Sequence, residues 1–256
     1  GYLGFSLYGL KAEMDTYLAE QKEVASLVQS SEEMSPELMG RLDKLMLETP
    51  QDKELDYLKT LALVKSHDYQ AALQASERYA KKNGQEADFG TTIPGRIKTY
   101  VFPILNPPKN RADNASYKVI LDKATYQGAK SFLSASIAVY QKTSLKEQAA
   151  NAIIRHYLSQ GQLASAEIWL NELMKEDRGL AIVACKVHYL YAKSNKKKAK
   201  KLLTKALREE PDNEELLQLK KKRRLAFPLG EALEGEESLQ VEDPLLAASS
   251  EEEKVS

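Results

Sequence analysis

Histidine and cysteine are the side chains that most often carry metal or nucleophilic chemistry, and this chain of 256 residues holds few of them. His67, His156 and His188 each stand without a second His, a Cys or a paired carboxylate at the spacing that metal ligands use. Cys185 is the single cysteine, so an internal disulfide and a cysteine-based zinc site are both excluded. The sequence therefore predicts no metal and no cofactor.

Phosphate-binding and nucleophile motifs are also missing from the sequence. The segment Gly-Thr-Thr-Ile-Pro-Gly at 90–95 lacks the Lys-Ser/Thr pair that completes a P-loop. No Gly-x-Ser-x-Gly nucleophile elbow is present. Acidic runs such as 251–253 are typical of solvated surfaces. We therefore expect no catalytic residues, no small-molecule substrate and no enzyme activity.

Basic side chains concentrate between Lys196 and Arg224 and end in the run 220–224. The whole chain nevertheless has a net charge of zero, so no overall field attracts nucleic acid or an anionic membrane. The basic run has no interleaved aromatic residues, on which single-stranded bases would stack. We expect these side chains to be solvated or paired with the acidic C-terminal segment, and not to bind nucleic acid.

The elements that carry these side chains are predicted to be helices. Apolar residues make up 43% of the chain, and Ala, Leu, Lys, Glu and Gln predominate. Three segments share one pattern, in which an apolar-periodic helix and a short polar turn precede a second helix that opens with Ala. The segments are Asn151–Asp177, Ala181–Pro211 and the surroundings of the turn His67–Tyr69, and a weaker copy covers Tyr117–Tyr140.

This pattern resembles the tetratricopeptide repeat. Ala166 and Ala199 are 33 residues apart, close to the family period of about 34. The small, large, small and Pro positions of the second helix are matched by Ala199, Leu203, Ala206 and Pro211. The family's Trp is missing from every copy, and its turn Gly from two of them. The resemblance implies an all-α, TPR-like helical-repeat solenoid of antiparallel helix pairs.

Proline, glycine and charge mark the boundaries within the chain. Pro and Gly interrupt the helical pattern between the first copy and the later ones, although a short helix is expected around Gly95–Val101. Acidic residues predominate after Leu225, where only Leu225–Leu233 has apolar residues that would dock on the last helix. The parts we expect are the end of a membrane anchor at 1–10, N-terminal helices (Lys11–Val28 and Pro36–Leu47) and the first repeat at 11–82, a Pro/Gly-rich crossover at 83–113, TPR-like repeats at 114–224 and a disordered acidic tail at 225–256.

The resemblance also implies a site. In tetratricopeptide-type arrays the first helix of each pair lines a concave groove in which a partner protein or peptide binds. Arg155 and His188, which are 33 residues apart, would occupy equivalent positions at the centre of that groove. The partner-binding residues that follow by position are Tyr57, Asn151, Arg155, His188 and Tyr191.

The apolar start, the polar helix and the later repeats are similar to the layout of membrane-anchored periplasmic assembly proteins, such as those of bacterial cytochrome c maturation. The ten apolar residues at the start are fewer than the about 20 that span a bilayer, so they would be the end of an anchor. This similarity implies a scaffold, assembly factor or chaperone at the bacterial inner membrane, facing the periplasm. The alternatives are a structural subunit of a large secretion-type or pilus-type envelope complex, and a cytoplasmic adaptor that uses the basic run for nucleic acid.

Overall fold

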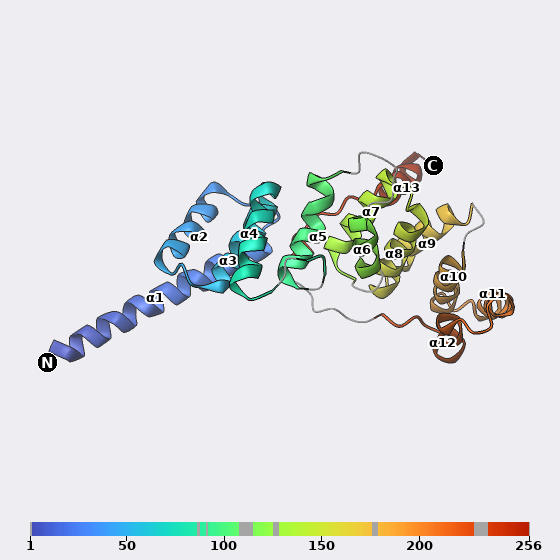
Figure 1. Ribbon diagram of the computed structural model, residues 1–256, viewed down its shortest axis with the longest axis horizontal. Helices are drawn as coiled ribbons and strands as arrows, with labels where there is room; N and C mark the ends of the chain where they lie inside the picture. Colours follow the sequence, from blue (N-terminus) through green and yellow to red (C-terminus); the bar gives the residue numbers. More distant parts are fainter. Residues whose placement is uncertain are drawn as a thin grey trace. The chain divides into compact units, whose positions relative to one another are not determined.

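The computed structural model describes most of the chain, and all the secondary structure in this part is helical, as the sequence predicts (Figure 1). The described residues are 2–85, 88–90, 92–107, 115–124, 128–175, 179–227 and 235–255, with side chains described between residues 7 and 252 of these ranges.

The chain divides into two compact units, each of which is described by itself. Unit 1 comprises 1–88, 92–101 and 233–240, and unit 2 comprises 89–91, 102–232 and 241–256. Unit 1 holds α1 (Tyr2–Ser30), α2 (Pro36–Glu48), α3 (Lys53–Lys65), α4 (Tyr69–Lys82) and the short 3-10 helix η1 (Glu236–Ser238). Unit 2 holds α6 (Ala115–Ala124), α7 (Lys130–Lys142), α8 (Lys146–Ser159), α9 (Leu163–Leu173), α10 (Leu180–Ala192), α11 (Lys196–Glu209), α12 (Glu214–Lys222) and α13 (Pro244–Val255). Helix α5 (Ile93–Leu105) contributes residues to both units.

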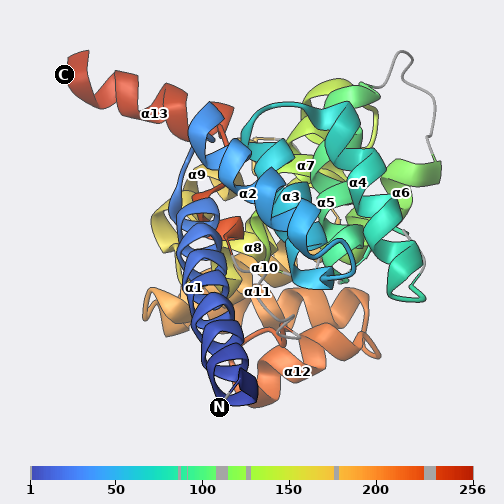
Figure 2. The same cartoon turned by 90° about the vertical axis from the view of Figure 1, so that its left-hand side faces the viewer.

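Helices α1 and α2 confirm the predicted helices Lys11–Val28 and Pro36–Leu47, although α1 begins earlier than predicted, at Tyr2. Helix α2 begins where Ser35 Oγ accepts a hydrogen bond from the amide of Leu38 at 3.1 Å, and Pro36 occupies the first helical position. Helix α1 packs against α2 and α3, and its first turns extend beyond them with Leu7 and Tyr8 exposed (Figures 1 and 2). None of the described helices combines the length and the apolar character needed to cross a bilayer. The membrane anchor at residues 1–10 stays a prediction.

A buried lysine closes the C-terminal end of α1. Lys65 is nearly inaccessible, and its Nζ donates to the carbonyl oxygens of Val28 at 2.6 Å and Gln29 at 2.8 Å. These carbonyls have no partner inside the helix, so a cation placed there complements the end of the helix dipole. Burial lowers the pKa of Lys65 to about 8. The last turn of α1 is thereby attached to α3.

Three helix pairs, α3–α4, α8–α9 and α10–α11, are joined by the same turn. His67, Gly161 and Ser194 adopt the left-handed conformation, with φ of 59°, 68° and 61°. At each turn the amide of the left-handed residue donates to the carbonyl oxygen three residues earlier. The amide of the next residue donates to the carbonyl oxygen five residues before it. These two hydrogen bonds are the Schellman motif. His and Ser therefore stand in the conformation that the family's turn Gly adopts, which accounts for two copies without glycine. Gly128 has a similar φ of 65° before α7 in the weaker copy.

A fully buried alanine follows each of these turns at the same distance. Ala72, Ala166 and Ala199 stand five residues after the left-handed residue, and each is 0% exposed. A side chain this small lets the second helix of a pair approach its neighbours closely. In unit 2, Ala166 and Ala199 belong to one buried cluster together with large side chains such as Trp169 and Leu203.

Helix α5 lies within the segment that the sequence predicts as a Pro/Gly-rich crossover, and it confirms the short helix expected around Gly95–Val101. It begins where Thr92 Oγ1 accepts from the amide of Gly95 at 3.2 Å, and it continues past Pro103 to Leu105. Residues 86–87, 91 and 108–113 of the expected crossover lie outside the described residues.

The expectation of a disordered tail is wrong for 225–227 and for the described residues after Gly235. Asp243 is buried in unit 2, where its carboxylate accepts hydrogen bonds from Trp169 Nε1 at 2.9 Å and from the Tyr157 hydroxyl. The second carboxylate oxygen accepts from the amide of Leu245 at 3.0 Å at the start of α13, which packs on α9. Acidic composition predicts solvation, but a carboxylate that several donors satisfy is stable when buried.

The repeated turn makes a testable prediction about stability. Ser194 is exposed, and its Cβ in the left-handed conformation costs about 1–2 kcal/mol, which exceeds the about 0.5–1 kcal/mol of extra chain entropy that Gly loses on folding. We therefore expect Ser194→Gly to raise the free energy of unfolding in urea by about 0.5–1 kcal/mol. Ser194→Ala, which keeps a Cβ at the same φ, serves as the control and leaves stability nearly unchanged. Equal stability of the Gly and Ala variants would contradict a strained left-handed conformation at position 194.

Candidate partner-binding site

Four of the five predicted contact residues lie in unit 2, on the first helices of neighbouring pairs. Asn151 and Arg155 belong to α8, and His188 and Tyr191 belong to α10. Tyr57 belongs to α3 in unit 1, where it is buried with its ring centroid 6.4 Å from that of Tyr79. The site that the structure describes therefore consists of residues from α8 and α10 together with the elements packed on them.

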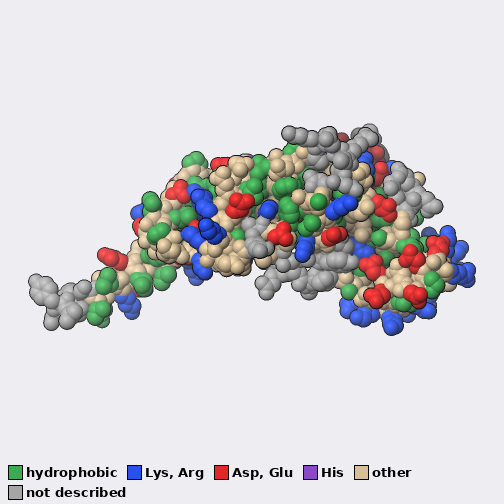
Figure 3. Space-filling view, viewed as in Figure 1, with side chains coloured by type: hydrophobic (Ala, Val, Ile, Leu, Met, Phe, Trp, Pro, Cys, Tyr) green, Lys and Arg blue, Asp and Glu red, His purple; other side chains and the backbone are tan. Residues whose placement is uncertain are grey.

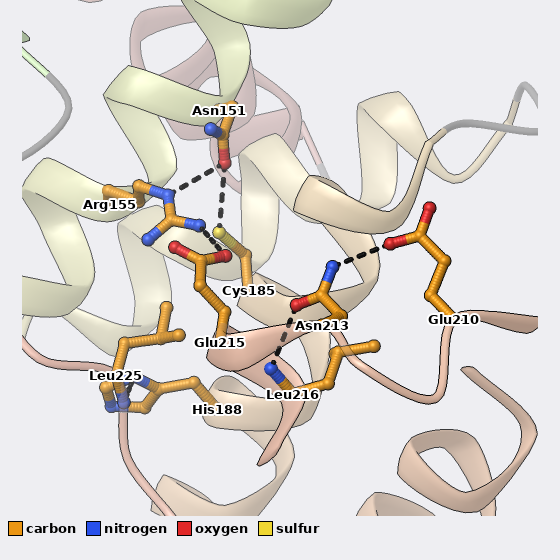
Figure 4. A network of polar contacts seen from close by, with 9 residues as sticks. All are labelled: Asn151, Arg155, Cys185, His188, Glu210, Asn213, Glu215, Leu216 and Leu225. Carbon is orange, nitrogen blue, oxygen red and sulfur yellow. Dashed lines mark hydrogen bonds and ion pairs between the residues drawn. The ribbon is translucent and has the colours of Figure 1, made fainter. Parts of the chain in front are cut away.

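Arg155 is the centre of a polar network inside unit 2 (Figure 4). Its side chain is 2% exposed, and Nη2 pairs with Glu215 Oε2 at 2.8 Å. Arg155 Nε donates to Asn151 Oδ1 at 3.1 Å, and the same oxygen accepts from Cys185 Sγ at 3.3 Å. Burial raises the pKa of the Cys185 thiol to about 11, so at neutral pH the thiol keeps the proton that it donates.

Glu215 comes from α12, and the start of this helix places it. Asn213 caps the helix by accepting from the amide of Leu216 at 3.2 Å, and its own Nδ2 donates to Glu210 Oε2 at 2.7 Å (Figure 4). Leu216 and Leu219 are fully buried where α12 packs on α10 and α11. Acidic residues in the first turn also suit the positive end of the helix dipole. The chain itself thus supplies a carboxylate to Arg155, which is not an open groove cation.

His188 is covered by the residues that follow α12. Its Nδ1 accepts from the amide of Leu225 at 3.0 Å, and its ring stacks on Phe227 with centroids 5.6 Å apart. Burial, together with the charges of Arg155 and Arg224, lowers the pKa of His188 to about 4. Leu225 and Phe227 dock on His188 of α10, whereas the sequence predicts docking of Leu225–Leu233 on the last helix. Leu229 and Leu233 fall outside the described residues. Arg155 and His188 are close to each other as expected, but α12 and 225–227 cover them.

Tyr191 is half-buried and lines a pocket of about 420 Å³ on the same unit. The pocket is formed by the end of α10, by α11 and by α12. The residues that line it are Tyr191, Lys200, Leu203, Thr204, Leu207, Arg208, Lys220 and Arg223. Of the five predicted contact residues, Tyr191 is the one that lines this pocket.

Sequence reasoning missed Glu215 and the pocket because it closed the last helix pair at Pro211 and assigned no helix to the rest of the repeat region up to residue 224. The segment Asn-Glu-Glu-Leu-Leu after Pro211 carries a capping Asn, acidic residues in the first turn and two leucines. These signals would have predicted α12, although not its packing on α10 and α11. Within the ranges that the structure describes, no group of three or more His, Cys, Asp and Glu side chains is placed to hold a metal ion.

Comparisons of the chain with protein families, with curated proteins and with solved structures find no match.

The network around Arg155 predicts that Glu215 stabilises the fold. Glu215→Gln leaves the buried guanidinium without its carboxylate, and we expect the free energy of unfolding to fall by about 1–3 kcal/mol, since the Glu215 side chain is itself 36% exposed. Glu214→Gln makes the same chemical change at the adjacent, exposed position and should stay within about 0.5 kcal/mol of the parent. Chemical denaturation of both variants measures the difference in stability. Equal denaturation midpoints for Glu215→Gln and Glu214→Gln would show that the ion pair does not stabilise the fold.

His188 predicts a pH dependence of stability. The folded chain keeps His188 neutral down to its pKa of about 4, whereas the unfolded chain binds the proton near pH 6.5. The stability that this neutral His188 contributes is therefore present above about pH 6.5 and is lost as the pH falls towards 4. We expect His188→Asn to lose less stability than the parent between pH 6.5 and 4.5. Burial and the charge of Lys130 lower the pKa of His156 to about 4 as well, so part of the pH dependence remains in the variant. Parallel stability–pH curves would exclude a role for His188.

Proposed function

We propose that this chain is a non-catalytic scaffold of TPR-like helix pairs that binds a partner protein. The observation that carries the proposal is the shared construction of α3–α4, α8–α9 and α10–α11. Each pair has a left-handed residue at the turn and a fully buried Ala five residues later. Arrays of such pairs present successive helices side by side as extended binding surfaces.

The partner contact is proposed at the face around Tyr191, and not at Arg155 and His188. The latter two are occupied by Glu215 and by Leu225 and Phe227, so a partner would have to displace contacts that the chain already makes. Tyr191 is half-buried beside Arg and Lys side chains, and Tyr and Arg are the residue types that most often anchor protein interfaces. The location in the bacterial envelope and the role as an assembly factor belong to the same proposal, and both stay predictions.

A photo-crosslinking amino acid at position 191 of the full chain tests the proposal in native cells. We expect it to capture a defined protein, while the same amino acid at the adjacent, exposed Ala192 captures it weakly. Tyr191→Ala should weaken binding of the captured protein about tenfold or more, whereas Lys197→Ala on the outer surface should change it little. A substoichiometric partner indicates an assembly factor, and a stoichiometric one a structural subunit. Capture of nucleic acid, or equal capture from both positions, would overturn the proposal.

A further inference from the structure

The pocket at Tyr191 combines a cationic rim with an apolar floor. The apolar lining residues Tyr191, Leu203 and Leu207 are buried or half-buried, whereas the polar lining residues are exposed. Those exposed residues are Lys200, Thr204, Arg208, Lys220 and Arg223. No carboxylate is among the lining residues that the structure describes. A ligand that fits this pocket must therefore offer both negative charge and an apolar group.

Among the described residues, the four cations of the pocket have no partner within the chain. Within the described part of the chain, the side chains of Lys200, Arg208, Lys220 and Arg223 form no ion pair and no hydrogen bond. Like charges gathered around one hollow repel one another, and their field is focused in the hollow. Binding an anion there relieves the repulsion.

The surrounding surface has the same sign. Residues 196–224 contain twelve Lys and Arg against five Asp and Glu, although the whole chain is neutral. Figure 3 shows Lys and Arg side chains gathered at the end of unit 2 that holds α11 and α12, with acidic side chains between them. Of the five acidic residues within 196–224, Glu215 already pairs with Arg155 and Glu210 accepts from Asn213. The basic excess is thus available to steer an acidic ligand.

The positions of the cations set the spacing of the ligand's charges. Lys200, Thr204 and Arg208 follow one face of α11 at intervals of four residues, so Lys200 and Arg208 are separated by about 12 Å along the helix. Lys220 and Arg223 lie one turn apart at the end of α12, on the other wall. Carboxylates about 12 Å apart would match Lys200 and Arg208 on the α11 wall, and an apolar side chain between them would reach the floor. A further carboxylate would face Lys220 and Arg223 on the other wall.

We infer that this pocket binds an acidic protein segment in which carboxylates flank an aliphatic or aromatic side chain. The inference rests on the proposed function and names the chemistry of its partner. A protein segment fits better than nucleic acid, because Leu203 and Leu207 offer nothing to a phosphodiester and Tyr191 is the single aromatic side chain among the described lining residues. It also fits better than a membrane surface, because the cations line a concave pocket between two helices and not a flat face.

The test is a titration of the full chain with a fluorescein-labelled peptide, followed by fluorescence anisotropy. The peptide has twelve residues, with Glu at every fourth position and a central Leu-Phe pair. We expect saturable binding that weakens at least tenfold when Gln replaces every Glu, and at least fivefold when Ala replaces Leu and Phe. Single-stranded oligo(dT) and phosphatidylserine vesicles serve as competitors and should displace the peptide poorly.

The matched variants separate the pocket from general charge. Lys200→Gln with Arg208→Gln removes two cations of the pocket, and Lys197→Gln with Lys201→Gln removes two from the same helix outside it. All four side chains are exposed, so neither pair should disturb folding, and thermal unfolding of both variants checks this. We expect at least a tenfold loss of affinity for the first pair and less than threefold for the second.

Three results would overturn the inference: no peptide binding, equal losses for the two pairs, or oligo(dT) or vesicles that bind more tightly than the peptide through Lys200 and Arg208. These outcomes are distinct from failure of the proposed function. If position 191 still crosslinks a protein while the acidic peptide does not bind, the scaffold proposal stands and the chemistry of its partner is different. If position 191 captures no protein although the peptide binds, the anion-binding pocket stands without the scaffold role.

Discussion

Close approach of helices at small side chains is the constraint on which the rest of this structure depends. Two helices can pack at short distance only where one of them has a side chain as small as Ala, and the chain must first turn back within three residues. The left-handed residue provides the turn, and Ala72, Ala166 and Ala199 provide the contact. Because turn and alanine keep the same separation in each pair, the first helices α8 and α10 meet, and α12 is added beside α10.

That arrangement explains why the most polar part of the predicted groove is internal. Once α8, α10 and α12 are neighbours, Arg155 faces the carboxylate of Glu215, and the pair is stabilised because Asn151 satisfies another guanidinium donor. The same principle attaches the acidic C-terminal segment. Asp243 is buried against Trp169 and Tyr157 because both provide donors, and the leucines that follow it then pack on the core of unit 2.

Substituting a charged side chain that is paired within the fold should therefore have a different effect from substituting one that is not paired there. The guanidinium of Arg155 is held by internal acceptors, so its substitution would report on stability first. Lys200 and Arg208 have no acceptor in the described part of the chain and border a pocket with an apolar floor, so their substitution would report on binding. Whether the cations border a pocket and lack an acceptor, and not how many basic residues there are, distinguishes a binding surface from one that is only solvated.

The sequence by itself determined the all-α class, the helices on either side of Ser35 and the three helix pairs, because capping residues, prolines and apolar periodicity act over a few residues. It also placed Arg155 and His188 at equivalent positions, since the repeat keeps a constant register. Only the tertiary structure decided that Glu215 forms an ion pair with Arg155 and that residues 225–227 cover His188. It also decided that Asp243 attaches the C-terminal segment to the core of unit 2. Each of these contacts joins residues 37 to 86 positions apart, and whether a charge is solvated or paired depends on which donors and acceptors the fold brings to it.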